Sequence, residues 1–188
     1  MPQHHIILHA HTTRRINRAV ENNLTEQRYP FKHVYTGIDK TVKRAVPLNV
    51  IRRIKELELD SKPHQDYARD MFMFSFYTRG MSFVDMAYLK KSDLRNGTLT
   101  YRRKKTGQQL TVKWEKCMED IMAKYSGRTA PQYLLPIITR PYDDERKQYQ
   151  NALYRVNGAL KAVARLVNLP MALTMYCARH SRPLQNMW

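Results

Sequence analysis

The sequence predicts an α+β, mainly α, fold with one small antiparallel sheet. Apolar residues recur at helical spacing over most of the chain, whereas residues 98–103 and 108–114 are rich in threonine and aromatic residues. The turn between those two segments, Lys104 to Gly107, is basic. With 188 residues the chain is long enough for one main hydrophobic core. We therefore expect helices packed around one core, with a single β-hairpin that has a basic tip.

The N-terminal part contains one expected helix. Its helical pattern runs from about Arg14 to Gln27 and should end at the Tyr29-Pro30 step, because the residue before proline disfavours the helical conformation. Residues 31–46 are basic and irregular. Residues 1–13 contain four histidines, and a short polar terminus of this kind is more often mobile than metal-binding. These histidines are His4, His5, His9 and His11.

The middle of the chain contains the predicted core. Pro47 is well placed to open an amphipathic, half-buried helix. Its apolar positions are Leu48, Ile51, Ile54 and Leu57. Residues 65–77 carry apolar side chains on nearly every face, which is typical of a helix at the centre of a core. Gly80 then permits a sharp change of direction before a short helix at residues 83–89.

After the hairpin we expect a helix at residues 115–125, a loop punctuated by Pro131, Pro136 and Pro141, and a long final helix. Asp143 can cap that helix, and Pro170 closes it. One apolar stripe follows its length. The stripe consists of Tyr149, Ala152, Leu153, Val156, Leu160, Val163 and Val167.

The charge favours a polyanionic partner. Lysine and arginine total 33 against 16 acidic residues, which gives a formal net charge of +17. Nucleic acid is the first candidate. Apolar stretches are interrupted well short of the roughly 18 residues that cross a bilayer, so we expect no membrane contact. Cys117 and Cys177 have no paired-ligand spacing, which predicts neither a zinc site nor a disulfide scaffold and fits the cytoplasm.

Three segments carry candidate chemistry. Residues 173–181 read Leu-Thr-Met-Tyr-Cys-Ala-Arg-His-Ser, and the hairpin tip contains Lys105-Thr106-Gly107. Upstream, residues 80–85 read Gly-Met-Ser-Phe-Val-Asp, and the segment continues through Leu89 to Ser92-Asp93-Leu94. Each piece alone is a weak signal. Their ordered occurrence, together with the expected layout of helix, hairpin and helix, is much more specific.

In this order, the three segments resemble the active-site segments of tyrosine recombinases, the phage-integrase family. The resemblance extends from about Arg14 to Ser181, and residues 78–94 are most similar to integrases of Bacteroides-type mobile elements. It implies the DNA breaking-rejoining fold and site-specific DNA recombination or integration. In this family a tyrosine attacks a DNA phosphodiester and forms a 3′-phosphotyrosyl link, which a second hydroxyl reverses, so neither metal nor other cofactor is needed.

The resemblance also implies roles for individual residues. Arg179 would clamp the phosphate, because a guanidinium offers paired donors to the charge of the transition state. Lys105 would protonate the departing 5′ oxygen, and His180 would lie near the phosphate or support the site. Other cations would position DNA through its phosphates without reading its sequence. These are Lys90, Lys91, Arg102, Arg103 and Lys104.

Two positions depart from the family pattern. Ser82 stands where the first catalytic arginine belongs, and a serine cannot replace a charged guanidinium. Arg79 could reach the same phosphate from a helical edge, or it could only balance the dipole at the end of the preceding helix. Tyr176 occupies the place of the histidine that precedes Arg179 by three residues.

The end of the sequence departs further. No tyrosine follows Tyr176, and Pro183 would disrupt the helix that the family has there. We therefore expect a C-terminally truncated catalytic core that lacks the nucleophile and binds double-stranded DNA weakly without cleaving it. The expected organisation is a poorly matched segment, a remnant of the helical core-binding domain with its linker, an incomplete catalytic domain, and an unrelated tail. These parts cover residues 1–13, 14–40, 41–181 and 182–188.

Other readings remain open at this stage. The runner-up is a non-catalytic basic DNA-binding module, and a third option is an RNA-binding or ribosome-associated helical protein. Lys105 could be a solvated turn residue, and Arg179 and His180 could be ordinary residues of a helix surface. Family members usually assemble as tetramers on DNA, so self-association on DNA is expected if the resemblance is functional.

Overall fold

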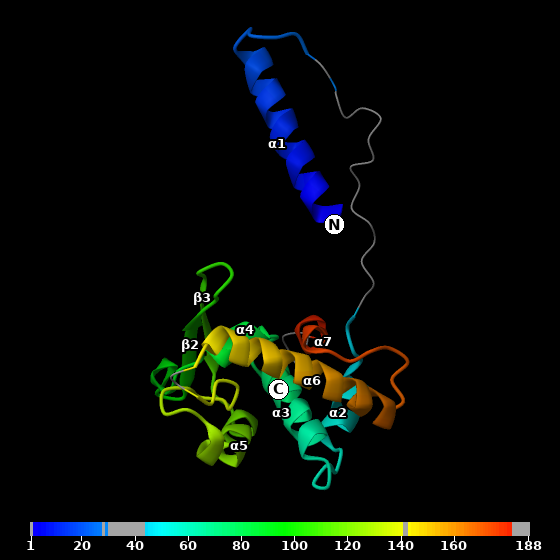
Figure 1. The fold of residues 1–188 in the computed structure, drawn as a ribbon, viewed down its shortest axis with the longest axis vertical. Helices are drawn as coiled ribbons and strands as arrows, with labels where there is room; N and C mark the ends of the chain where they lie inside the picture. Colours follow the sequence, from blue (N-terminus) through cyan, green and yellow to red (C-terminus); the bar gives the residue numbers. More distant parts are fainter. Residues whose placement is uncertain (1, 28, 30–43, 141–142, 182–188) are drawn as a thin grey trace. The chain divides into compact units, whose positions relative to one another are not determined.

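The computed structural model describes residues 2–27, 29, 44–140 and 143–181, with side chains from residue 12 onward (Figure 1). The chain divides into two compact units, Met1–Val42 and Lys43–Trp188, and each is described by itself. The irregular segment expected at residues 31–46 lies mostly outside the described residues, as do Pro141 and the tail from Arg182 onward. The side chains of the four N-terminal histidines also lie outside them.

The first unit contains helix α1, Pro2–Glu21. The prediction of a helix from about Arg14 to Gln27 was wrong at both ends, and residues 2–13 are helical rather than an irregular terminus. The helix ends well before Pro30 because Asn23 adopts the left-handed conformation, with φ of 54°. The Asn23 and Leu24 amides then donate to the carbonyls of Val20 and Ala19, a Schellman ending.

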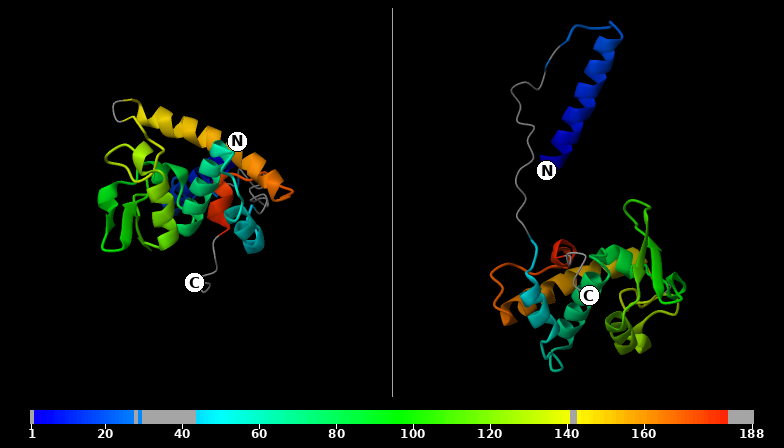
Figure 2. Two further views of the ribbon diagram at one scale, coloured as in Figure 1. Left: turned by 90° about the horizontal axis from the view of Figure 1, so that it is seen from below. Right: turned by 180° about the vertical axis from the view of Figure 1, so that it is seen from behind.

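The second unit confirms a mainly helical protein with a small antiparallel sheet (Figure 2). Its α-helices are α2 (Leu48–Lys55), α3 (Pro63–Tyr77), α4 (Phe83–Ala87), α5 (Lys116–Lys124), α6 (Glu145–Leu166) and α7 (Met175–His180). Its strands are β1 (Leu94–Arg95), β2 (Thr98–Arg102) and β3 (Gln109–Lys113), and two short 3₁₀ turns are η1 (Lys91–Asp93) and η2 (Ser126–Arg128). In the part of the chain that is described, no helix is both long and apolar enough to cross a bilayer.

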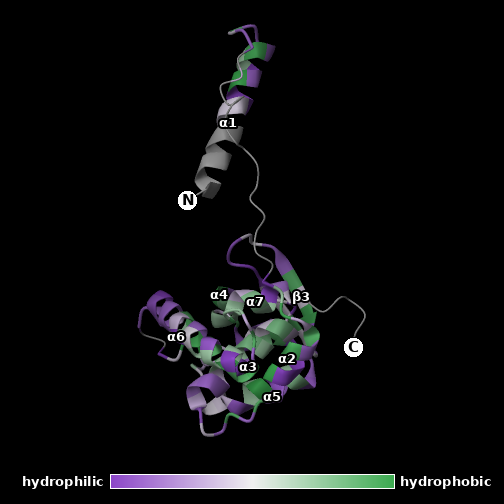
Figure 3. Ribbon diagram, turned by 90° about the vertical axis from the view of Figure 1, so that its right-hand side faces the viewer, coloured by the Kyte–Doolittle hydropathy of each residue, from purple (hydrophilic) through white to green (hydrophobic). Residues whose placement is uncertain are grey.

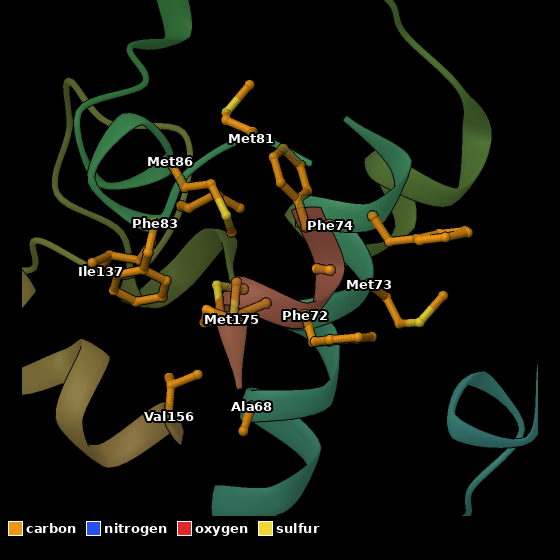
Figure 4. Close-up of a cluster of buried hydrophobic side chains, with 14 of the residues drawn as sticks. Ala68, Phe72, Met73, Phe74, Met81, Phe83, Met86, Ile137, Val156 and Met175 are labelled. Atoms are coloured by element: carbon orange, nitrogen blue, oxygen red, sulfur yellow. The ribbon is translucent and has the colours of Figure 1, made fainter. Parts of the chain in front are cut away.

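Helix α3 is the centre of the core, as predicted. Its buried side chains cover several faces and pack against α5, α6 and α7. In Figure 4, Phe72 and Phe74 of α3 belong to one cluster with Val156 of α6 and Met175 of α7. Each such side chain contributes about 1.5–3 kcal/mol when it is fully removed from water. The helices α5, α6 and α7 are therefore positioned by how they cover α3.

Helix α6 shows the predicted apolar stripe, with Val156, Leu160 and Val163 buried against the core. Two details of its ends were wrong. The cap is Asp144, whose side chain accepts from the Lys147 amide at 3.0 Å, while Asp143 pairs with Arg140 instead.

Pro170 does not close this helix either. Asn168 ends it in the left-handed conformation, with φ of 51°, and the Leu169 amide donates to the carbonyl of Ala164. Leu173 lies buried just before α7. The connection therefore turns at Asn168 and re-enters the core before α7.

The sheet has three strands in the order β1-β2-β3, so the prediction of a single hairpin was incomplete. Strand β1 pairs antiparallel with β2 through Leu94 and Leu99. Asn96 and Gly97 join them, both at positive φ, as a two-residue hairpin turn requires. Helix α4 is also shorter than expected, because it ends at Ala87 rather than Leu89.

An ionic network fixes α5 on α3. The Asp70 carboxylate is 5% exposed and accepts from Arg69 Nε at 2.9 Å, Lys124 Nζ at 2.7 Å and the Tyr125 hydroxyl at 2.8 Å. Lys124 also pairs with Asp66. Burial, and then the Asp70 charge, raise the pKa of Tyr125, which therefore stays a donor.

Candidate nucleic-acid interface

The chain reverses direction at residues 78–82, here called the α3–α4 corner. Helix α3 ends in a Schellman motif: the Arg79 amide donates to the Phe76 carbonyl at 3.1 Å, and the Gly80 amide donates to the Ser75 carbonyl at 2.7 Å. Arg79, with φ of 60°, takes the left-handed position that glycine usually fills. Arg79 therefore follows the end of α3 rather than lying within the helix, and its contact with the phosphate stays a prediction. Its side chain is exposed.

Buried hydroxyl groups hold the corner in place. Ser75 Oγ donates to the Met81 carbonyl at 2.7 Å, and Thr78 Oγ1 donates to the Phe74 carbonyl at 2.7 Å. Both side chains are almost fully buried. These bonds satisfy carbonyls that the end of α3 and the turn would otherwise leave without partners.

The corner lies directly against α7. A Cβ atom added to Gly80 would come within 2.7 Å of Arg179 Cα and 3.2 Å of Arg179 Cγ. Real Cβ atoms essentially never approach so closely, so only glycine fits there. The fold therefore brings the segment Gly80-Met81-Ser82 and Arg179 together, although they are far apart in sequence.

A buried carboxylate connects the same corner to the hairpin. Ser82 Oγ donates to one oxygen of Asp85 at 2.5 Å and caps α4 by accepting from the Asp85 amide at 3.3 Å. The other Asp85 oxygen accepts from the Lys104 backbone amide at 2.8 Å. Asp85 is 4% exposed, so these bonds are shielded from water. The first residue of the hairpin turn is thereby fixed to the corner.

Sequence reasoning missed Asp85. A serine followed three residues later by an acid is a known signal for a helix start, and it was available here. That signal explains the cap, but the bond to Lys104 depends on where the hairpin packs. It could not be deduced from local sequence.

The hairpin turn presents Lys105 to solvent. Arg103 and Gly107 close the turn through backbone bonds of 2.8–2.9 Å, and Gly107 has φ of 68°. Figure 3 shows this turn near the hydrophilic end of the colour scale. Lys104 lies with Nζ 4.0 Å from the centre of the Tyr88 ring, a cation–π contact. Lys105 is exposed.

Helix α7 is anchored at both ends. The Met175 amide donates to Asn157 Oδ1 of α6 at 2.9 Å. At the other end, Ser181 Oγ donates to the Cys177 carbonyl and accepts from the Val46 amide, both at 2.7 Å. Met175, Cys177 and Ala178 are buried in the core, and Arg179 is partly exposed.

Two further predicted site residues lie on the open face of α7. Tyr176 is 52% exposed, and His180 is exposed as well. Their rings meet edge to face, with centroids 4.3 Å apart. Both side chains are therefore accessible to a ligand beside Arg179.

A pocket of about 290 Å³ lies between α4 and the hairpin. Lys90, Arg102 and Lys104 line it, but so do three carboxylates. The acids are Asp85, Asp93 and Glu145, and three tyrosines also contribute, namely Tyr88, Tyr101 and Tyr133. This pocket is therefore of mixed charge rather than uniformly basic.

The predicted DNA-contacting cations do not all lie in one place. Lys91 is exposed on η1 outside that pocket, and Arg103 is partly buried at the base of the turn. Arg102 donates to the Gly107 carbonyl at 3.2 Å and so also supports the turn. In the same region, burial followed by the hydrogen bond to Glu145 raises the pKa of Tyr133 to about 12.

Three cations of the corner, the hairpin turn and α7 form no ion pair with an acidic side chain of the described residues. Within the described ranges, ion pairs use other basic residues, and none involves Arg79, Lys105 or Arg179. An unpaired guanidinium or ammonium group remains available to an external anion. In the part of the chain that the structure describes, no group of three or more His, Cys, Asp or Glu side chains could hold a metal ion.

The second unit and its site define a mainly helical α+β protein with a small three-stranded antiparallel sheet, and this fold resembles that of a recombinase. One solved structure with this likeness is that of XerA recombinase, which matches with probability 1.00 and a TM-score of 0.51 at 16% sequence identity. The match covers 85% of this chain and 51% of that chain, so this chain spans about half the length of the recombinase. No family model and no curated protein matches the sequence.

Proposed function

We propose that this chain contains the phosphate-binding part of a tyrosine-recombinase catalytic domain, and that it acts in site-specific DNA recombination or integration. One observation carries the proposal: the contact of Gly80 with Arg179 and the Asp85 bridge from Ser82 to Lys104 join the three segments that resemble the family. The fold resemblance to a recombinase and the formal net charge of +17 support it.

In this proposal Arg179 binds the nonbridging oxygens of one DNA phosphate, and Lys105 protonates the departing 5′ oxygen from the hairpin turn. Tyr176 and His180 donate to the phosphate or position it from the exposed face of α7. Ser82 is already hydrogen-bonded to Asp85 and carries no charge, so Arg79 supplies the additional guanidinium.

The proposal for Arg79 has its own test. In a cleavage-competent protein, Arg79→Ala should reduce strand cleavage strongly, whereas Ser82→Ala should change it little beyond a loss of stability. The assignment to Arg79 fails if Arg79→Ala cleaves normally and Ser82→Ala does not cleave.

The nucleophile has to be supplied for such a test. Tyr176 is the last tyrosine of the printed sequence, and it occupies the place of the family's histidine. We propose that the 188-residue polypeptide binds double-stranded DNA without forming a covalent adduct, and that family-like action involves a tetramer on the DNA. An origin in an integrase of a Bacteroides-type mobile element is a finer proposal of the same kind.

Covalent capture tests the function. A chimaera that joins the C-terminal segment of XerA recombinase after Ser181 should relax supercoiled plasmid and leave a DNA–protein adduct in detergent. Arg179→Ala in the chimaera should abolish both. If the chimaera folds and binds DNA but never forms the adduct, the chain is better described as a non-catalytic basic DNA-binding module.

Competition with structured RNA addresses the remaining alternative. Duplex DNA and a folded RNA of equal length should be compared at one stated salt concentration, because phosphate contacts depend steeply on salt. Preferential binding to the RNA would contradict the proposed function.

A further inference from the structure

A cation outside the three resembling segments lies against α7. The Arg44 guanidinium carbon is 5.6 Å from the centre of the Tyr176 ring, within the range of a cation–π contact. Arg44 is exposed, and it precedes the first helix of the second unit by several residues. Nothing in the sequence pattern around Arg44 singles it out as a functional residue.

The position of Arg44 is fixed by a second, independent contact. Two residues further along the chain, the buried Val46 amide donates to Ser181 Oγ at 2.7 Å. Ser181 in turn is bonded to the Cys177 carbonyl within α7. The backbone that carries Arg44 is therefore tied to the end of the helix that carries Arg179.

The Tyr176 ring offers a preorganised platform. One contact is with Arg44, and the edge-to-face contact with His180, at 4.3 Å, restricts the ring from a second direction. A guanidinium held at this distance over a ring by a cation–π contact still has N–H groups that can donate to a phosphate in pairs. Arg44 makes no ion pair with any carboxylate of the described residues.

We propose that Arg44, held over the Tyr176 ring by a cation–π contact, is a second phosphate-binding guanidinium beside α7 and contacts the DNA backbone next to the phosphate bound by Arg179. This inference rests on the proposed function for its ligand, a nucleic-acid phosphodiester. It assigns to Tyr176 a further role, that of holding Arg44 in place. Arg44 would thus add a positive charge beside α7, whereas Ser82, at the place of the family's first arginine, adds none.

The test is the affinity of the 188-residue chain for a fluorescein-labelled duplex, measured by anisotropy between about 50 and 200 mM salt. Arg44→Ala should weaken binding about tenfold, as expected for one charge-assisted contact. It should also reduce the slope of log affinity against log salt by about 0.9. The matched control is Arg128→Ala, because Arg128 is an exposed arginine of η2, which follows α5, and it forms no ion pair with any described residue.

Two further variants separate the contribution of the cation–π contact from that of the charge. Arg44→Lys should keep the slope of log affinity against log salt but lose part of the affinity, because an ammonium group cannot donate to a phosphate in a planar pair. Tyr176→Leu, which removes the ring, should weaken binding more than Tyr176→Phe, which keeps it. Thermal melting of each variant shows that the loss does not arise from unfolding.

The outcomes distinguish the inference from the proposed function. If Arg44→Ala changes the affinity and the salt slope no more than Arg128→Ala does, while Arg179→Ala weakens binding, the role of Arg44 is refuted and the proposed function stands. If Arg44→Ala weakens binding and Arg179→Ala does not, the contact by Arg44 is supported and the proposed site is wrong. If the wild-type chain does not bind the duplex, both are wrong.

Discussion

Replacing Gly80 by alanine is the sharpest perturbation of the α3–α4 corner. Gly80 has φ of 79°, and an added Cβ would lie 2.7 Å from Arg179 Cα. A non-glycine residue in the left-handed region costs about 1–2 kcal/mol. Forcing the α7 backbone away adds an overpacking cost of about 1–3 kcal/mol. We expect Gly80→Ala to lower the free energy of unfolding by about 2–5 kcal/mol.

Gly97→Ala is a matched control. Gly97 has a similar φ of 69°, but an added Cβ would meet nothing within 4 Å. This variant should therefore show only the conformational cost of about 1–2 kcal/mol. The difference between the two variants isolates the contact between the corner and α7.

Urea unfolding followed by circular dichroism measures both free energies. The clash at Gly80 is with a backbone atom, so truncating the partner in a Gly80→Ala, Arg179→Ala double variant should not relieve it. Gly80→Ala should also weaken duplex binding, because Arg179 is displaced, while Gly97→Ala should not. Equal destabilisation by the two single variants would refute the close packing of the corner on α7.

Two further predictions concern stability. Asp70→Asn should cost about 1–3 kcal/mol in urea unfolding, because it removes the charge of the buried acceptor of Tyr125 and Lys124 while Asp66 still pairs with Lys124, whereas Asp120→Asn, which breaks an exposed pair, should cost less than about 1 kcal/mol. Equal effects would contradict the structural role of the network. Burial raises the pKa of Tyr77 from 10.0 to about 12, so its contribution to stability is present below pH 10 and is lost as the pH rises through about 12. The free energy of unfolding should fall across this range, less steeply in Tyr77→Phe, and identical slopes in the two proteins would contradict the prediction.

The helices of the second unit could be predicted from the spacing of their apolar residues, because the faces that are apolar in the sequence are the faces that are buried in the structure. Helix α3 reads as apolar on most faces and is buried on most faces, and α6 shows one stripe and buries one side. The ends of the helices in both units were less predictable. Asn23 ends α1 and Asn168 ends α6 in the left-handed conformation, which asparagine permits but does not require.

Strand β1, which the sequence analysis did not predict, shows the limit of β-strand propensity as a signal. Strand β1 has only two residues and no apolar alternation, so pairing with β2 decides its conformation. The Asn96-Gly97 turn was the available signal. Short strands of this kind follow from the tertiary structure rather than from their own composition.

The sequence suggested candidate site residues, but it did not indicate which residues connect them. The order of the three segments pointed to Ser82, Lys105 and Arg179, and the fold brings their neighbourhoods together through Gly80 and Asp85. These connecting residues depend on long-range packing, which no local pattern encodes.

The most direct test of the central claim is whether Arg179 and Lys105 act on the same DNA phosphate. The salt slope of duplex binding counts the phosphates that a protein neutralises, at about 0.9 for each. If both side chains bind one phosphate, the Arg179→Ala, Lys105→Ala double variant should lose about 0.9 in slope, and the single variants should be non-additive in binding free energy. A loss of about 1.8 with additive energies, or no loss at all, would contradict the account.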